Sequence, residues 1–287
     1  MKIRKFILII AAAVTFFAPA MLSAQESESG INSGNHGLHL RGGLGAGSIF
    51  WGYISHGSSS ADLGTGPGAN LNLAAMYNYS FLGLEFSMLT GNIGDLEWKD
   101  TDEGTSQEYT YKSTGTGSYN TYDFKIGAKL FTEPGDMGYT YFYAGKRFWN
   151  SERKQDSVEY GTTVIATDQT RKAKGDGWIA GYRDFSTFGW DEGFAIVMQT
   201  GIFFGDAPVS EMTTNGIDQK FPVKDSLFFG VEAAGGVAFQ NIGLSIIGGL
   251  RGEINATTFN DSEAPTSDES IFGFGNVVFF IEAGMMF

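Results

Sequence analysis

The sequence predicts an all-β chain that folds as a single up-and-down antiparallel transmembrane β-barrel. After residue 36, apolar and polar residues alternate with the period of two that is typical of β-strands. The connections between these alternating segments are in turn long and short. Beyond the first residues, no apolar run approaches the ~20 residues of a transmembrane helix. A chain that crosses a bilayer without such helices must do so as a closed barrel, because its backbone polar groups have to be hydrogen-bonded internally.

Residues 1–24 have the pattern of a secretory signal peptide. Three basic residues precede the apolar run 6–18, and small residues follow it. The run is too short to span a bilayer as a helix, and no cysteine follows it as in a lipoprotein signal. We therefore expect cleavage after Ala24 and a single exported barrel domain over residues 25–287.

Composition excludes several classes of partner and chemistry. Without the three basic residues of the signal, 16 Lys and Arg oppose 32 Asp and Glu, a net charge of −16. Such a surface repels nucleic acid, so no nucleic-acid partner is expected. The chain has no cysteine, which excludes a disulfide framework and thiol chemistry. Its 41 glycines and 15% aromatic residues suit strands with close bends and aromatic girdles.

Each of the first four strands is predicted from an apolar face. In the first, leucines oppose glycines and charged residues, and in the second, leucine, alanine and tyrosine alternate with asparagine. The short link Ser80-Phe81 joins the second strand to the third in a tight hairpin. In the fourth, apolar residues alternate with Asp123, Lys125 and Lys129. These four strands are expected over 38–50, 69–79, 82–88 and 122–130.

Six further strands complete the barrel. The fifth, near 138–148, is aromatic on both faces, so its alternation leaves open which side points inward. The sixth and seventh are weaker, whereas the eighth and ninth form the clearest hairpin, which turns at Gln240-Asn241. The total is ten strands, with eight and twelve as alternatives. The last five are expected over 177–186, 194–205, 227–239, 242–250 and 272–287.

The connections support this topology. Long loops on one side and short turns on the other are what a transmembrane barrel requires, whereas a soluble sandwich has no reason to sort its loops in this way. Within the third long connection, residues 157–166 are expected to extend the neighbouring strands. Aromatic residues at strand ends, such as Tyr77, Tyr79 and Trp149, are expected in an interfacial girdle. The long polar connections are 55–68, 91–117, 149–174, 206–224 and 254–270.

The closing strand carries the most specific signal. Its apolar face ends on a carboxy-terminal aromatic residue and comprises Phe279, Ile281, Ala283, Met285 and Phe287, with Val277 before them. Together with the signal peptide and the sorted loops, this strand resembles the C-terminal signature of bacterial outer-membrane β-barrel proteins, over the whole mature chain. The resemblance is to small barrels of OmpW or omptin size. It implies location in the outer membrane, contact with outer-membrane lipid and lipopolysaccharide, and recognition of the last strand by the barrel-assembly machinery.

Charged residues on the inward-facing side of the strands form the candidate site. We expect oppositely charged partners, because an isolated charge in a narrow lumen is costly to desolvate. The expected pairs are Glu85 with Lys129, Arg41 with Glu282 across the closing seam, and Arg251 with Glu232. They either line a path or fill the interior; a barrel of roughly eight strands has room only for side chains, which favours filling. The set comprises Arg41, Glu85, Asp123, Lys125, Lys129, Glu232, Arg251, Glu253 and Glu282.

No catalytic, metal or cofactor site is expected. The only histidines are His36, His39 and His56, whereas the omptin proteases take a His–Asp pair from a later strand end. No histidine or cysteine spacing suits a metal. The acidic segments 100–103 and 261–263 lack the full ligand set of a calcium loop.

Two functions follow from this reading. The first is a narrow channel or transport barrel for small solutes, including a carrier of hydrophobic solutes of the OmpW kind. The alternative is a surface-exposed interaction or structural barrel, adhesin-like, with a plugged lumen and acidic extracellular loops. The extracellular ligand of such loops is unknown from the sequence, and enzymatic activity is not expected.

Overall fold

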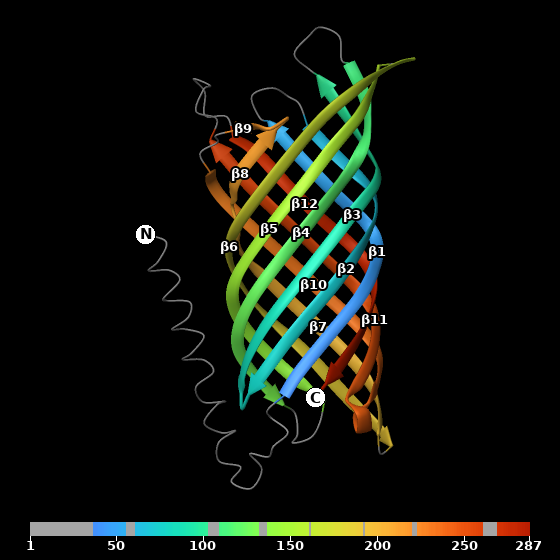
Figure 1. Cartoon of the computed structure of the whole chain (residues 1–287), viewed down its shortest axis with the longest axis vertical. Helices are drawn as coiled ribbons and strands as arrows, with labels where there is room; N and C mark the ends of the chain where they lie inside the picture. Colours follow the sequence, from blue (N-terminus) through green and yellow to red (C-terminus); the bar gives the residue numbers. More distant parts are fainter. Residues whose placement is uncertain are drawn as a thin grey trace.

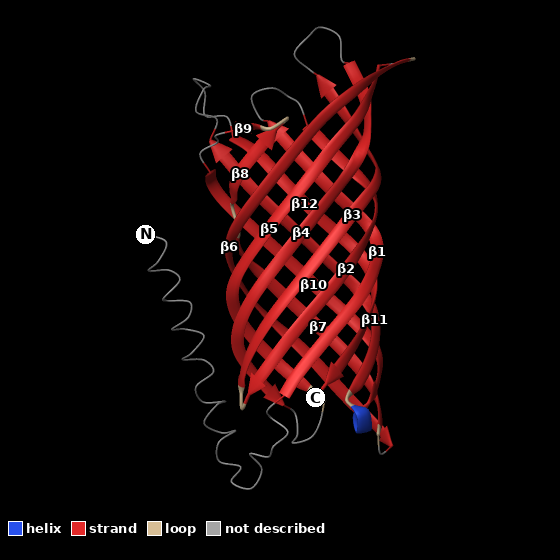
Figure 2. Ribbon diagram, in the orientation of Figure 1, coloured by secondary structure: helices blue, strands red, loops and turns tan. Residues whose placement is uncertain are grey.

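The computed structural model describes residues 37–55, 61–102, 109–131, 137–160, 162–191, 193–219, 223–260 and 269–287. Within these ranges the chain forms a closed antiparallel barrel of tilted strands (Figure 1). Almost every described residue belongs to a strand (Figure 2). No helix among them is long and apolar enough to cross a bilayer. The expected signal peptide, residues 1–24, lies outside the described residues.

Twelve strands form one sheet, and ten of them build the barrel. The remaining two, β8 (Val209–Thr214) and β9 (Ile217–Gln219), form a hairpin on the upper edge of β6. One turn of 3₁₀-helix, Gln240–Ile242, joins β10 to β11. The barrel strands are β1 (Gly37–Ser55), β2 (Ala61–Tyr79), β3 (Leu82–Asp102), β4 (Tyr109–Phe131), β5 (Tyr139–Tyr160), β6 (Thr163–Asp191), β7 (Phe194–Asp206), β10 (Val223–Phe239), β11 (Leu244–Asn260) and β12 (Glu269–Met286).

The up-and-down topology with ten barrel strands confirms the predicted fold. Barrel strands that are consecutive in the chain pair in antiparallel fashion, and β7 pairs directly with β10, the next barrel strand after the β8–β9 hairpin. The first and last strands close the barrel along seventeen residue pairs, from His39 opposite Met286 to Ser55 opposite Ser270. The N-terminal end of β1 and the C-terminal end of β12 therefore lie at the same end of the barrel, which we call the turn end. The opposite end is the loop end.

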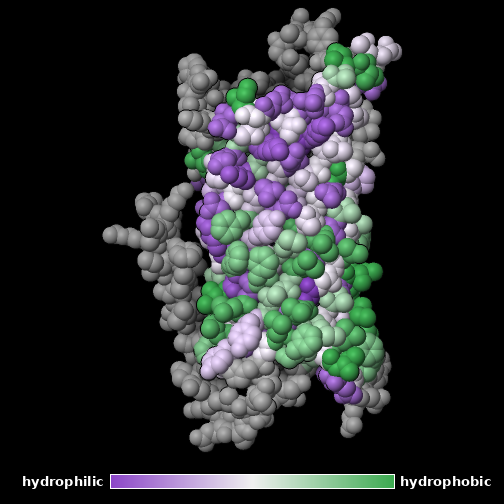
Figure 3. Space-filling model, viewed as in Figure 1, coloured by the Kyte–Doolittle hydropathy of each residue, from purple (hydrophilic) through white to green (hydrophobic). Residues whose placement is uncertain are grey.

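The outer wall divides into two zones along the barrel axis (Figure 3). Apolar side chains cover the half nearer the turn end, where Leu44, Phe279 and Ile281 are 68–71% exposed. Toward the loop end the wall is polar and carries cross-strand ion pairs, such as Glu152 with Lys172 at 3.1 Å. A transmembrane strand needs only about 9–11 residues, so strands of 17 to 29 residues such as β6, β10 and β11 extend well beyond an apolar zone of bilayer thickness.

Three predicted loops are largely strand, which corrects the expected boundaries. The segments 55–68, 91–117 and 149–174 belong mostly to β1–β6. In the third of these segments, outward side chains such as Lys154, Lys172 and Lys174 are exposed. The polarity of this segment therefore does not mark an interruption of the sheet. The expected strand extension over 157–166 is confirmed on both sides of the β5–β6 turn. The loop over 206–224 likewise contains the β8–β9 hairpin, whose Asn215-Gly216 turn has the two positive φ angles, 52° and 78°, of a type I′ turn.

The interior is packed rather than hollow. Near the turn end, Tyr139 stacks on Phe185 with 5.4 Å between ring centroids. Toward the loop end, Trp149 stacks on Phe272 at 6.0 Å and is 2% exposed. Trp149 therefore belongs to an internal aromatic core, and its predicted place in the girdle is wrong. Between these two aromatic layers lies a layer of charged side chains.

Candidate functional site: the charged layer inside the barrel

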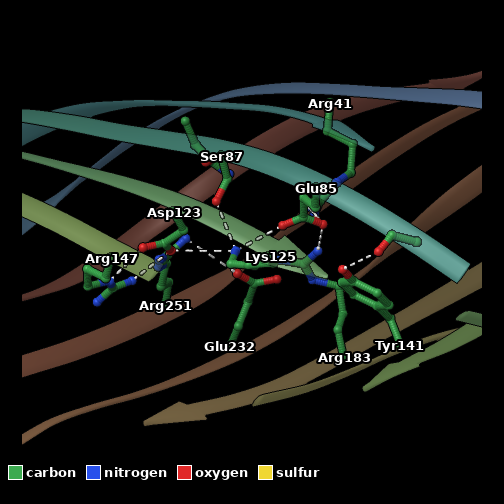
Figure 4. A network of polar contacts seen from close by, with 12 residues as sticks. Arg41, Glu85, Ser87, Asp123, Lys125, Tyr141, Arg147, Arg183, Glu232 and Arg251 are labelled. Atoms are coloured by element: carbon green, nitrogen blue, oxygen red, sulfur yellow. Dashed lines mark hydrogen bonds and ion pairs between the residues drawn. The ribbon is translucent and has the colours of Figure 1, made fainter. Parts of the chain in front are cut away.

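The charged layer comprises ten side chains that project into the lumen from eight strands. Figure 4 labels all of them except Glu253 and Glu282. Each is inward-facing because alternate residues of a strand point to the same side of the sheet. Nine are buried to below 10% exposure as whole residues, and the side chain of Arg251 is 13% exposed. The layer consists of five acids and five bases: Glu85, Asp123, Glu232, Glu253 and Glu282, with Arg41, Lys125, Arg147, Arg183 and Arg251.

Glu85 on β3 is the acceptor for three cations. Its Oε1 accepts a hydrogen bond from Lys125 Nζ at 2.9 Å. Its Oε2 accepts hydrogen bonds from Arg183 Nη1 at 2.8 Å and from Arg41 Nη2 at 3.3 Å. These donors come from β4, β6 and β1, so a single carboxylate connects three different sectors of the wall.

Arg147 on β5 organises the second half of the layer. It donates to both carboxylate oxygens of Asp123, at 2.7 and 2.9 Å, in a bidentate pair. It also donates to Glu253 on β11. Its guanidinium lies 4.2 Å from the ring centroid of Phe228, which adds a cation–π contact from the core above. The Asp123 carboxylate joins the two halves, because Lys125 Nζ lies 3.5 Å from its Oδ2.

The layer continues to the closing seam through β12. Arg41 Nη1 on β1 donates to Glu282 Oε1 at 3.3 Å. Asn72 on β2 reaches across β1 and donates to Glu282 Oε2 at 2.9 Å. The residue it crosses is Gly43, where a Cβ atom would lie 2.7 Å from the Ile281 carbonyl oxygen. A glycine in this position leaves the space that the Asn72–Glu282 hydrogen bond occupies.

Two of the three predicted ion pairs are present. Arg41 pairs with Glu282, and Arg251 lies 3.8 Å from Glu232. The β3–β4 register places Lys125, rather than the predicted Lys129, directly opposite Glu85. Lys129 lies nearer the turn end, with its Nζ 4.0 Å from the Tyr139 ring centroid. All nine predicted residues have inward positions, and eight of them belong to the charged layer.

Sequence reasoning missed Arg147 and Arg183. Arg147 lies on the strand that is aromatic on both faces, and Arg183 lies on a strand with weak alternation. Tyr139, Tyr141 and Tyr143 are buried and share the odd parity of Arg147. If these tyrosines had been interpreted as inward-facing, the odd-numbered residues of β5, including Arg147, would have been predicted to point into the lumen.

The other sequence candidates lie apart from this layer. Phe279, Ile281 and Phe287 of the closing strand face outward at 68–71% exposure, with Ala283 and Met285 on the same face. His39 is buried near the turn end, edge-on to Tyr139. His36, His56 and the acidic segment 261–263 lie outside the described residues. Among the described residues, no group of three or more acidic or histidine side chains is arranged to hold a metal ion.

The space left inside the layer is small. The cavity bordered by Arg41, Lys125, Arg183 and Glu232 has a volume of about 20 Å³. One water molecule needs ~10–15 Å³ of such volume. This cavity therefore has room for about one water and none for a hydrated solute.

The chain matches no protein-family model and no curated protein sequence. Its structure is similar to that of the outer membrane protease OmpT from Escherichia coli, with a TM-score of 0.60 and 11% sequence identity over 91% of this chain and 99% of OmpT. The chain therefore has the closed up-and-down β-barrel fold of this protease. An outer membrane channel from Pseudomonas putida F1 is a more distant match, with a TM-score of 0.31 and 12% identity over 91% of this chain and 98% of the channel. At these identities the similarity extends to the fold alone.

Proposed function

We propose that this protein is an outer-membrane barrel with a closed lumen, which holds a polar wall and its loops at the cell surface for interactions with other molecules. The observation that carries the proposal is the charged layer, which links β1, β3, β4, β5, β6, β10, β11 and β12 across the lumen and leaves a cavity of about 20 Å³. The buried aromatic core around Trp149 and Phe272 adds a second packed layer toward the loop end.

The proposed orientation follows from the two zones of the outer wall. The apolar zone near the turn end would face outer-membrane lipid, with the short turns in the periplasm. The polar zone and the loop end would then lie outside the cell, next to lipopolysaccharide. We propose the outward apolar face of β12, which includes Phe279 and Ile281, as the surface that the barrel-assembly machinery recognises.

A narrow channel is the second candidate, because the lumen at this level is lined by charges rather than by apolar groups. Conduction would require the charged layer to separate. Glu85 alone would have to release Arg41, Lys125 and Arg183 while buried, and a buried charge that loses its partner is destabilised by about 3–5 kcal/mol. This cost favours the closed barrel.

We also propose that the protein is not a protease, although OmpT shares its fold. The one described histidine, His39, is 1% exposed and lies on the turn-end side of the charged layer, beside Tyr139. A peptide substrate arriving from outside would have to pass the aromatic core and the charged layer to reach it. Cleavage of fluorogenic peptides by the refolded protein, abolished by His36→Ala or His56→Ala, would contradict this proposal.

Solute efflux from proteoliposomes tests the closed lumen. Vesicles containing the refolded mature chain are loaded with arabinose, and the rate of sugar release is compared with that of empty vesicles. We expect equal rates, with folding verified by the shift in electrophoretic mobility on heating. Release that scales with the amount of inserted protein would favour the channel.

A further inference from the structure

Among the residues that the structure describes, the upper part of β6 is paired along one edge only. Among the described strands, β8 pairs with β6 only over Arg171–Gly175 and β7 only from Trp178 onward. Asn215 ends this pairing: its backbone N–H donates to the Thr170 carbonyl oxygen, and its Oδ1 accepts from the Thr170 N–H, both at 2.8 Å. Beyond Thr170, β5 is the only described partner of residues 163–169.

The segment 163–167 lacks two features that normally prevent strand addition, a charged side chain and a proline. Exposed edges in natural sheets are usually protected by charged residues, especially lysine, or by proline. The segment 163–167 reads Thr-Val-Ile-Ala-Thr and contains neither. Lower on the same strand, where β8 covers the edge, Lys172 and Lys174 are present. The free part of β6 is thus the part without protection.

The edge also exposes apolar side chains on both faces of the ribbon. Val164 is 65% exposed and Ile165 is 48% exposed. They lie at the tip of the β5–β6 hairpin, which projects beyond the barrel wall at the loop end (Figure 1). This position is far from the apolar zone of the outer wall, so lipid does not cover them.

The length and charge of the edge define what fits it. A register shift between Gln155 and Ser157 against β6 leaves Thr163–Ala166 as its regular part. Three acidic residues surround this part: Asp156 and Glu159 on β5, both exposed, and Asp168, whose side chain is 89% exposed. Two bases lie nearby: Lys154, 3.8 Å from Asp168, and Lys112, which the β4–β5 register places opposite Glu159. The surplus of negative charge disfavours a second copy of the same hairpin and favours a basic partner.

We propose that a short, extended and basic segment of another polypeptide adds to β6 at Thr163–Ala166 as an additional strand. Backbone hydrogen bonds to the free edge would supply the pairing, Val164 and Ile165 would contact alternate side chains of the segment, and the surrounding carboxylates would attract its basic ends. This inference rests on the proposed function in one respect: both place the loop end of the barrel outside the cell.

Peptide binding to the refolded full chain in detergent micelles tests this inference. The probe is a fluorescent Lys-Thr-Val-Thr-Val-Thr-Lys peptide, followed by anisotropy. Two control peptides carry either a central proline, which removes a backbone donor, or glutamate in place of both lysines. We expect binding of the probe, and binding roughly tenfold weaker for either control.

Matched protein variants locate the binding site. Val164→Lys and Ile165→Lys are expected to weaken probe binding by roughly tenfold, because a lysine protects the edge and repels the basic peptide. Ile217→Lys makes the same change on β9, at a residue 66% exposed but outside the edge, and is expected to leave binding within about twofold.

Absence of probe binding, or equal binding to the edge variants and to Ile217→Lys, would overturn the inference. The result is independent of the efflux experiment, because the edge lies outside the lumen. Solute release with intact peptide binding would overturn the closed-lumen proposal alone. No release combined with no peptide binding would overturn the strand-addition proposal alone.

Discussion

Glu85 on β3 and Arg183 on β6 meet inside the barrel with 2.8 Å between Oε2 and Nη1, although two strands, β4 and β5, separate them along the wall. Both side chains are buried. A contact of this kind crosses the lumen instead of following the wall. The ion pair between Arg147 on β5 and Glu253 on β11 also crosses the lumen. Through these two ion pairs, the inward-facing charges form a continuous layer across the barrel.

Removing the central acceptor is expected to destabilise the barrel strongly. Glu85→Gln leaves Arg41, Lys125 and Arg183 buried around a neutral amide, and loss of one partner of a buried ion pair costs about 3–5 kcal/mol. The measurement is urea unfolding of the protein in lipid vesicles, followed by tryptophan fluorescence.

The matched control for Glu85 is an exposed pair on the outer wall. The side chains of Glu211 and Lys174 lie 2.7 Å apart and are 63% and 56% exposed. Glu211→Gln is expected to change the free energy of unfolding by less than about 1 kcal/mol, because exposed pairs are screened by water. Equal losses for the two glutamate variants would show that the charged layer does not stabilise the fold.

Substitution by alanine is expected to change the free energy of unfolding differently at two inward-facing glycines. At Gly201 an added Cβ would meet its nearest atoms at 3.5 and 3.7 Å, in ordinary van der Waals contact. At Gly236 it would collide with the Ile246 carbonyl oxygen and lie 2.7 Å from the Ile247 Cα. We expect Gly236→Ala to cost about 1–3 kcal/mol, as overpacking does, and Gly201→Ala to stay within about 0.5 kcal/mol. Urea unfolding in lipid vesicles measures both losses. A larger loss of stability for Gly201→Ala than for Gly236→Ala would contradict the closer packing around Gly236.

Trp149 is expected to matter to stability although it lies toward the polar end of the barrel. Its ring stacks on Phe272, and its Nε1–H donates to the Ala207 carbonyl oxygen at 2.8 Å. Trp149→Ala is expected to cost about 3–5 kcal/mol, the usual range for a buried aromatic residue. Thermal unfolding in detergent provides the measurement, with Tyr79→Ala, 64% exposed on the outer wall, as the control. A loss no larger than that of the control would place Trp149 at the surface.

The sequence predicts this fold well because every strand of a barrel has the same alternation of inward-facing and outward-facing residues. Alternation along each strand assigned the inward side of Glu85, Asp123, Lys125 and Glu232 without any knowledge of the topology. Strand length was not predictable in the same way: outside the apolar zone, outward residues such as Glu152 and Lys172 are polar because they face water, and a window of polar residues then looks like a loop.

The partners within the charged layer depend on register and on distance across the lumen. Local sequence does not encode either. Glu85 was assigned to Lys129 from approximate height, whereas the ladder places Lys125 opposite it. The Glu85–Arg183 contact joins residues 98 positions apart on non-adjacent strands, so no hairpin argument points to it. The pair Arg41–Glu282 was predictable because the first and last strands of a closed barrel must be neighbours.

Single-channel recording of the refolded mature chain in planar bilayers tests the closed charged layer most directly. Insertion is verified by recovering folded protein from the same membranes. The account predicts no steady conductance from the unaltered protein. Steady conductance steps, with an ion selectivity that changes when Arg41→Glu or Lys125→Glu reverses a charge in the layer, would contradict it.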